Sequence, residues 1–299
     1  MNKGIVIGIA AYTLWGLFPI YWRLLEQDPA VEILAHRMVW SLLFMLGILV
    51  LQGQLSRLKE ALKNRRILLV YALAAVLLSL NWYTYIWAVN AGYVVEASLG
   101  YFINPLVNFL LGVIFFREKL RVGQLAAVFL ATLGVIYLTF NYGSLPWIAL
   151  VLAFSFGMYG LIKKAAPLES MHGFSLETTV MFLPALGFLL YRQSTGMAAF
   201  VNQGVLVTLL LILAGPVTSI PLLMFGYSAR KIPLSMLGFI QYITPTLQLL
   251  LGVFLFLEPF PVNRLIGFGV IWLALLIYSL EGLLFTRRLK ANHSLVKLA

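Results

Sequence analysis

Cysteine is absent from this sequence of 299 residues, and only 10% of the residues are charged. Without cysteine the chain forms no disulfide, no thiolate metal site and no thiol nucleophile. Charged residues average about 25% of a soluble domain, so a chain that is 62% hydrophobic leaves almost no room for such a domain. The composition therefore predicts an integral membrane protein. We interpret its first apolar run, residues 4–22, as a transmembrane helix rather than a cleaved signal peptide.

Catalytic and nucleotide-binding residues are also scarce. Asp28 is the one aspartate, and the three histidines, His36, His172 and His293, lie far apart in the sequence. These residues exclude an intramembrane aspartyl pair and a His-Glu-x-x-His zinc site, and no Gly-x-x-x-x-Gly-Lys-Ser/Thr loop is present to bind ATP. We therefore expect that the chain is not an enzyme and that it binds no metal and no cofactor.

Apolar runs of membrane-spanning length recur along the whole chain. They predict an all-α fold of ten transmembrane helices, at about residues 4–24, 32–52, 67–90, 94–116, 121–140, 146–164, 173–191, 204–226, 233–257 and 263–284. If the N-terminus is cytoplasmic, 17 of the 21 Lys and Arg residues fall in cytoplasmic segments, including a basic tail at residues 285–299. This asymmetry follows the positive-inside rule. It predicts that both termini face the cytoplasm of a bacterial inner membrane, and it explains the formal net charge of +11 without any nucleic acid.

An internal repeat appears at a spacing of 140 residues. Residues 101–113, Tyr-Phe-Ile-Asn-Pro-Leu-Val-Asn-Phe-Leu-Leu-Gly-Val, match residues 241–253, Gln-Tyr-Ile-Thr-Pro-Thr-Leu-Gln-Leu-Leu-Leu-Gly-Val. We assign the halves to residues 4–140 and 146–284, with five expected helices each. Because five is an odd number, the second half must enter the membrane from the opposite side. Inverted repeats of this kind are typical of secondary transporters, which bind substrate where the repeats meet.

Polar residues recur with the repeat. Each copy carries three of them on one helix face, at positions i, i+3 and i+7: Tyr101, Asn104 and Asn108 in the first, and Gln241, Thr244 and Gln248 in the second. Each set flanks a proline, Pro105 or Pro245, which we expect to break its helix. Such groups often only bond across packed helices. Two symmetric sets beside helix breaks nevertheless favour a substrate site near the membrane midplane.

Further candidates lie in the helix expected at 67–90. Asn81, Tyr83 and Tyr85 are placed deep enough to form an aromatic and amide wall of a substrate cavity. Aromatic residues near a helix end more often form an interfacial belt. Flat aromatic walls with a few amides suit planar or amphipathic solutes.

Charged residues within the expected helices are few. Arg37 lies roughly 9 Å into its helix, at about 1.5 Å per residue. It could extend to the outer interface, pair with Glu32 or Glu96, or bind an anionic part of a substrate. His36 and Glu96 are candidates for proton coupling, although Glu96 also suits the N-terminus of its own helix electrostatically. Glu96 is the only acidic residue that we expect near the cavity.

Three segments of the chain resemble the RarD proteins, of the EamA group in the drug/metabolite transporter superfamily. They are Ala-His-Arg-Met-Val-Trp-Ser-Leu-Leu at residues 35–43, Asn-Trp at 81–82 with Tyr-Ile-Trp-Ala-Val-Asn at 85–90, and Glu-Ala-Ser-Leu-Gly-Tyr-Phe-Ile-Asn-Pro-Leu at 96–106. The resemblance extends over nearly the whole chain and implies a ten-helix inner-membrane permease of two EamA repeats. It also implies that the first, third, fourth, sixth, eighth and ninth helices surround a central cavity, with the fifth and tenth outside. Relatives in this group are commonly labelled chloramphenicol-sensitivity permeases, which describes a phenotype and identifies no substrate.

The sequence therefore predicts a secondary transporter. We expect an exporter of a small organic metabolite or drug-like solute that works by alternating access. The alternative is an uncoupled channel or facilitator, which would need a continuous polar line across the membrane, whereas the polar residues here cluster near the centre. The expected partners are the solute, the lipid bilayer and, as one option, a second copy in a homodimer.

Overall fold

The computed structural model describes residues 2–90, 93–140, 146–255, 265–267 and 269–282. Its elements are α1 (Lys3–Arg23), α2 (Ala30–Leu51), α3 (Leu55–Lys63), α4 (Arg65–Asn90), α5 (Val94–Phe116), α6 (Val122–Phe140), α7 (Trp147–Ala165), α8 (Ser170–Ser194), α9 (Val205–Lys231), α10 (Leu234–Gln241), α11 (Ile243–Leu250), a π-helical turn (Leu251–Leu255) and a last helix (Leu265–Gly282). Ten helical segments of the described chain are long and apolar enough to cross a membrane. The prediction of an all-α, ten-helix membrane protein is confirmed. The expected basic tail, residues 285–299, lies outside the described residues.

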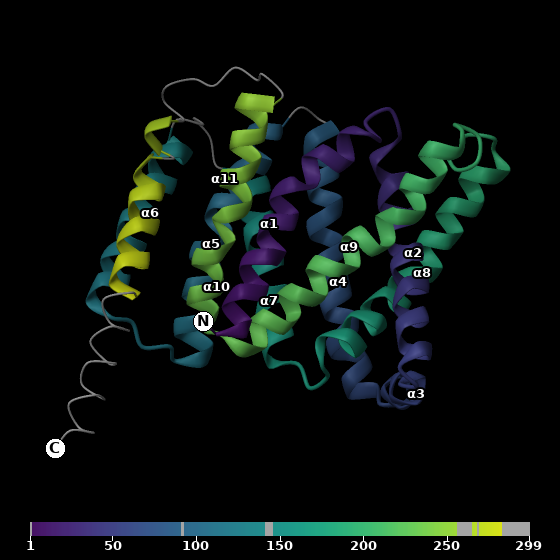
Figure 1. Cartoon of the computed structure of the whole chain (residues 1–299), viewed down its shortest axis with the longest axis horizontal. Helices are drawn as coiled ribbons and strands as arrows, with labels where there is room; N and C mark the ends of the chain where they lie inside the picture. Colours follow the sequence, from purple (N-terminus) through teal and green to yellow (C-terminus); the bar gives the residue numbers. More distant parts are fainter. Residues whose placement is uncertain (1, 91–92, 141–145, 256–264, 268, 283–299) are drawn as a thin grey trace.

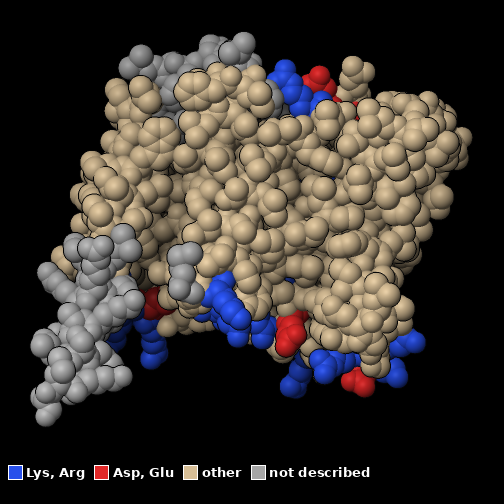
Figure 2. All heavy atoms as spheres, in the orientation of Figure 1, with Lys and Arg blue, Asp and Glu red and all other residues tan. Residues whose placement is uncertain are grey.

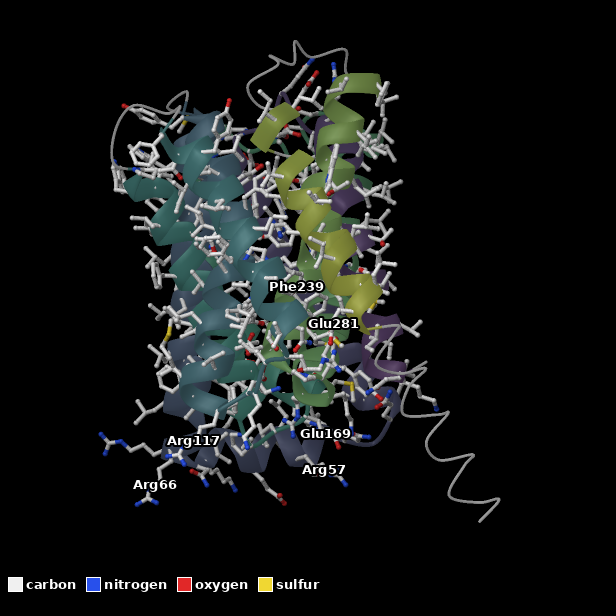
Figure 3. All side chains as sticks on the ribbon, turned by 90° about the vertical axis from the view of Figure 1, so that its left-hand side faces the viewer. Arg57, Arg66, Arg117, Glu169, Phe239 and Glu281 are labelled. Atoms are coloured by element: carbon white, nitrogen blue, oxygen red, sulfur yellow. The ribbon has the colours of Figure 1, made fainter. Side chains whose placement is uncertain are left out.

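One helix was not expected. α3 lies in the loop that the sequence places between the second and third spans, with Leu58 and Ala61 buried and charged side chains outward. This pattern is typical of a short helix that rests on a membrane surface. Arg57, Arg66 and Arg117 extend from the same end of the molecule (Figure 3). Figure 2 shows Lys and Arg side chains gathered along that lower edge, with an almost uncharged band above it.

The two copies of the internal repeat lie against each other and run in opposite directions. Near one end of the pairing, the Tyr242 hydroxyl donates to the Phe102 carbonyl at 3.2 Å. Towards the other end, the Leu234 amide donates to the Glu118 carboxylate at 2.7 Å. Residue numbers therefore rise along α10 and α11 as they fall along α5, and Figure 1 shows α10 and α11 stacked beside α5. This antiparallel pairing is what the predicted inversion requires.

The two repeated prolines have different effects. Pro245 cannot donate to the carbonyl of Gln241, and the helix is interrupted at Tyr242, between α10 and α11. The expected break at Pro105 is wrong, because α5 continues as one helix from Val94 to Phe116. Prolines also lie inside the continuous helices α1, α8 and α9, so a proline alone does not interrupt a helix here.

α6 and the last helix pack together at one edge of the molecule (left in Figure 1). A Cβ added at Gly134 of α6 would lie 2.8 Å from the Ile271 side chain, and one added at Gly267 would lie 2.5 Å from Leu138. Glycine therefore allows these two helices to approach closely. Their position at the edge agrees with the resemblance, which implies that the fifth and tenth spans lie outside the centre.

α2 and α9, from different repeats, come closest at Gly215. A Cβ added there would lie 2.4 Å from the carbonyl carbon of Trp40 and 2.7 Å from the backbone nitrogen of Ser41. The Ser41 hydroxyl donates to the Gly215 carbonyl at 3.2 Å. Because the contact is with backbone, no side-chain rotation can make room for a larger residue.

We expect Gly215→Ala to lower the melting temperature of the purified protein in detergent. Overpacking typically costs about 1–3 kcal/mol, which exceeds the gain of up to about 1 kcal/mol from alanine's helix propensity. Gly187→Ala in α8 is the matched control, because nothing lies within 4 Å of a Cβ added there. The control should melt at or above the wild-type temperature. Equal melting temperatures for the two variants would contradict the close approach of α2 and α9.

Candidate functional site

The polar face of α5 bonds to both neighbouring helices at mid-depth. The Asn104 amide donates to the Ala153 carbonyl of α7 at 2.6 Å. The Asn108 amide donates to the Gln241 side-chain oxygen at 2.8 Å and to that of Asn104 at 3.2 Å. The Asn108–Gln241 bond joins the two copies of the repeat directly. The predicted midplane residues are thus brought together, and their amide groups link helices.

The second set of polar residues bonds to α1. Thr244 donates to the Tyr12 carbonyl at 2.7 Å, and Gln248 donates to the Trp15 carbonyl at 3.3 Å. Two buried oxygen atoms in this region, Oδ1 of Asn108 and the hydroxyl of Tyr12, have no hydrogen-bond partner among the described residues. Both residues are buried, so neither atom reaches solvent in this conformation.

The α4 candidates lie on different faces of their helix. Asn81 is buried and donates to the Leu152 carbonyl at 2.8 Å and to the Ser155 hydroxyl at 2.9 Å. The ring of Tyr85 meets that of Tyr101 edge-on, with 5.7 Å between centroids. Tyr83 does not join them, since it is 59% exposed on the outward stripe that includes Leu73, Val76 and Leu80. The expectation that Tyr83 lines the cavity is therefore wrong, because one residue of helical rotation turns it from the face of Trp82 towards lipid.

Arg37 occupies a slot between two tryptophans. Its guanidinium carbon lies 4.7 Å from the centroid of the Trp22 ring and 4.3 Å from that of Trp82. Its Nε donates to the Thr218 hydroxyl at 2.8 Å. The considered pairing with Glu32 does not occur, because Glu32 binds Arg192 instead. Within the described part of the chain no carboxylate forms an ion pair with Arg37.

Of the two coupling candidates, only His36 can be placed. Its side chain is buried, Trp40 donates to its Nδ1 at 3.2 Å, and its ring stacks near that of Phe200. Accepting that bond requires an unprotonated Nδ1, so His36 is assigned as neutral here. The side chain of Glu96 lies outside the described residues.

A cavity of about 20 Å³ lies between α2, α4 and α8. Its lining includes Arg37, Ser41, Ser79, Trp82 and Glu177. Space of this size holds roughly one water molecule. α5 and α10, from different repeats, pack so closely that a Cβ added at Gly238 would lie 2.7 Å from the backbone oxygen of Pro105.

Glu177 is a cavity residue that the sequence interpretation missed. Its carboxylate pairs with Lys163 at 2.8 Å and accepts a hydrogen bond from the Tyr159 hydroxyl at 3.0 Å. The side chains of Lys163 and Glu177 are 3% and 2% exposed. The expectation that Glu96 is the only acid near the cavity is therefore wrong. A carboxylate within an expected apolar span, residues 173–191, was the sequence signal for Glu177.

Two other carboxylates of the first repeat bond to the second repeat at opposite ends of the molecule. In the first, the Glu32 link, the carboxylate accepts from Arg192 Nη2 at 2.9 Å and from the Ala199 amide at 2.6 Å. In the second, the Glu118 link, the carboxylate accepts from the Leu234 amide at 2.7 Å and from the Ser235 hydroxyl at 2.6 Å. Both links are closed in this conformation.

Comparisons with known proteins agree with this architecture. The model of the EamA-like transporter family matches residues 2–140. The chain is 48% identical to Protein RarD of Streptomyces exfoliatus, over 97% of this chain and 92% of that protein. It is 46% identical to the uncharacterized transporter YojE of Bacillus subtilis, over 97% and 98% of the two chains. A crystal structure that is 18% identical shares the fold, with a TM-score of 0.69 and coverage of 96% of this chain and 98% of that one.

We expect Lys163→Met to destabilise the protein more than the removal of both charges. Breaking a buried pair typically costs about 3–5 kcal/mol because it leaves one charge unpaired, whereas replacing both partners by apolar residues is often neutral. Melting temperatures of Lys163→Met, Glu177→Leu and the double variant test this, with the exposed Lys59→Met as control. A double variant that melts below both single variants would contradict the pairing.

Proposed function

This chain belongs to the EamA-like transporter family as a RarD-like permease, and from that premise we propose that it is a secondary transporter that exports a small organic solute by alternating access. It is a multi-pass membrane protein. We place it in the bacterial inner membrane, with the end that carries Arg57, Arg66 and Arg117 in the cytoplasm, because basic residues favour that side.

The observation that carries this proposal is the pair of links between the repeats. Both the Glu32 link and the Glu118 link connect the first repeat to the second, and they do so at opposite ends of the helices. Alternating access requires that such contacts open at one end while those at the other end stay closed. The central Asn108–Gln241 bond lies between the two ends and offers a pivot for the movement.

The contacts of the links suit a reversible gate. Glu118 accepts hydrogen bonds from the amides of Leu234 and Ser235, at the N-terminus of α10, where the helix dipole favours a carboxylate. Lys164 lies 3.7 Å from the same carboxylate. When the link opens towards water, each of these groups becomes hydrated rather than stranded, so the cost of opening stays small.

An uncoupled channel is less well supported by the packing at mid-depth. The amides and hydroxyls that the sequence places there bond to partners on other helices. A pore would instead need a continuous path for water across the membrane.

We propose that the solute gradient or an exchanged proton drives transport. Glu177 joins His36 and Glu96 as a group able to carry the proton.

Transport by the reconstituted protein tests this function. Metabolites that accumulate in cells lacking the protein, and in the medium of cells producing it, supply the candidate solutes. In liposomes without ATP, we expect saturable uptake of at least one of them, accelerated by the same solute loaded inside. Uptake that stays linear with concentration and ignores internal solute would indicate a channel. Protein that moves none of the candidates would overturn the proposed function.

A further inference from the structure

Arg37 is a charged residue within a membrane-spanning helix, where a charge is energetically unfavourable. It lies seven residues after Ala30, the first residue of α2, and therefore roughly 10 Å into the span at about 1.5 Å per residue. Charged residues at such depth are rare, face the protein interior and usually have an ion partner. The described acids of the cavity region are engaged elsewhere, since Glu177 pairs with Lys163 and Glu32 pairs with Arg192.

Arg37 lies over two aromatic rings and makes one hydrogen bond. Trp22 and Trp82 approach the guanidinium at 4.7 Å and 4.3 Å, which attracts the cation through their ring faces. Of the five N–H donors of arginine, the one on Nε is used by Thr218. The structure records no acceptor, among the residues it describes, for the four N–H groups on the two terminal nitrogens.

The N–H groups on the terminal nitrogens of a guanidinium match the shape and charge of a carboxylate. Two parallel N–H groups in one plane match the two oxygens of a carboxylate, and such pairs are stronger than neutral hydrogen bonds. The Thr218 bond and the two neighbouring rings restrain the guanidinium before an anion arrives. Tyr85 and Tyr101, whose rings meet edge-on with 5.7 Å between centroids, add aromatic surface in this region.

The charges around Arg37 determine how many negative charges a bound anion can carry. Arg37 supplies one positive charge, and the other buried cation of the region, Lys163, is already neutralised by Glu177. A monoanion is therefore compensated, whereas a dianion such as a phosphate monoester would leave one charge buried without a partner. The aromatic walls favour a planar body attached to that anion.

We propose that Arg37, held between Trp22 and Trp82, is the subsite for the carboxylate of a planar, aromatic organic acid. This assignment rests on the proposed transport function, because it names the class of solute carried. The cavity of about 20 Å³ admits only a water in the present conformation. The acid enters when one of the repeat links opens, and its carboxylate then replaces water at the guanidinium edge.

Binding to the purified protein in detergent tests the subsite without any transport assay. The probes are 4-hydroxybenzoate, its neutral amide 4-hydroxybenzamide, and the dianion phenyl phosphate. Isothermal titration and ligand-dependent melting should show saturable binding of the carboxylate, at least tenfold tighter than that of either other probe. Arg37→Lys should weaken carboxylate binding at least tenfold, because an ammonium lacks the planar fork. The exposed Arg66→Lys should change nothing.

The stability of the ligand-free variants separates the subsite from a structural role. Arg37→Lys and Arg37→Gln should melt near the wild-type temperature if the fork has no carboxylate partner in the protein. Tight carboxylate binding by Arg37→Gln, or an amide that binds as well as the acid, would overturn the subsite. A large fall in the melting temperature of Arg37→Gln with carboxylate binding intact would also overturn it. Binding without flux in liposomes would instead count against the transport function alone.

Discussion

The lack of water in the hydrocarbon core is the constraint on which the rest of this structure depends. A polar group there must find its partner within the protein. The amides of α5 find theirs on the other repeat, where Asn108 bonds to Gln241 and Asn104 bonds to the Ala153 carbonyl. In the opposite direction, Thr244 of the second repeat donates to the Tyr12 carbonyl of the first. Neither repeat could satisfy these groups alone, so the polar contacts hold the inverted halves together at their centre.

The same constraint governs the buried charges. Lys163 and Glu177 neutralise each other, and Tyr159 satisfies a further carboxylate oxygen. Arg37 is stabilised differently, by two aromatic faces and one hydroxyl. Among the described residues this cation has no ion partner, which is the basis of the proposed carboxylate subsite. The proposed solute subsite therefore lies between the two ends at which the repeats are linked, where alternating access requires it.

Much of the fold could be predicted from the sequence because the bilayer imposes length and composition on each span. The expected helix ends agree closely with those observed, with the largest difference at α9, which ends at Lys231 rather than near 226. The break before Pro245 follows directly from its missing N–H group. The continuous α5 at Pro105 could not be foreseen, because the sequence alone does not distinguish a proline that interrupts a membrane helix from one that the helix accommodates.

The site was harder to predict than the fold. Asn104 and Asn108 were recognised, but the carbonyl groups of α1 and α7 that hold the polar faces have no sequence signature. Glu177 meets Lys163 only because α8 folds back on α7, so its charge gave no hint of its partner. Arg37 was recognised as unusual, whereas the two rings beside it come from α1 and α4, and the sequence does not show that these helices meet at Arg37.

Two spin-label distances test most directly whether the links between the repeats open alternately. The chain has no native cysteine, so labels can be placed at Gln27 and Ser194 beside the Glu32 link, or at Lys119 and Lys231 beside the Glu118 link, all four exposed. Pulsed dipolar measurements should show that Glu32→Gln lengthens the first distance and leaves the second short. Glu118→Gln should do the reverse. Distances that lengthen together in either variant, or that change in neither, would contradict alternating access through these links.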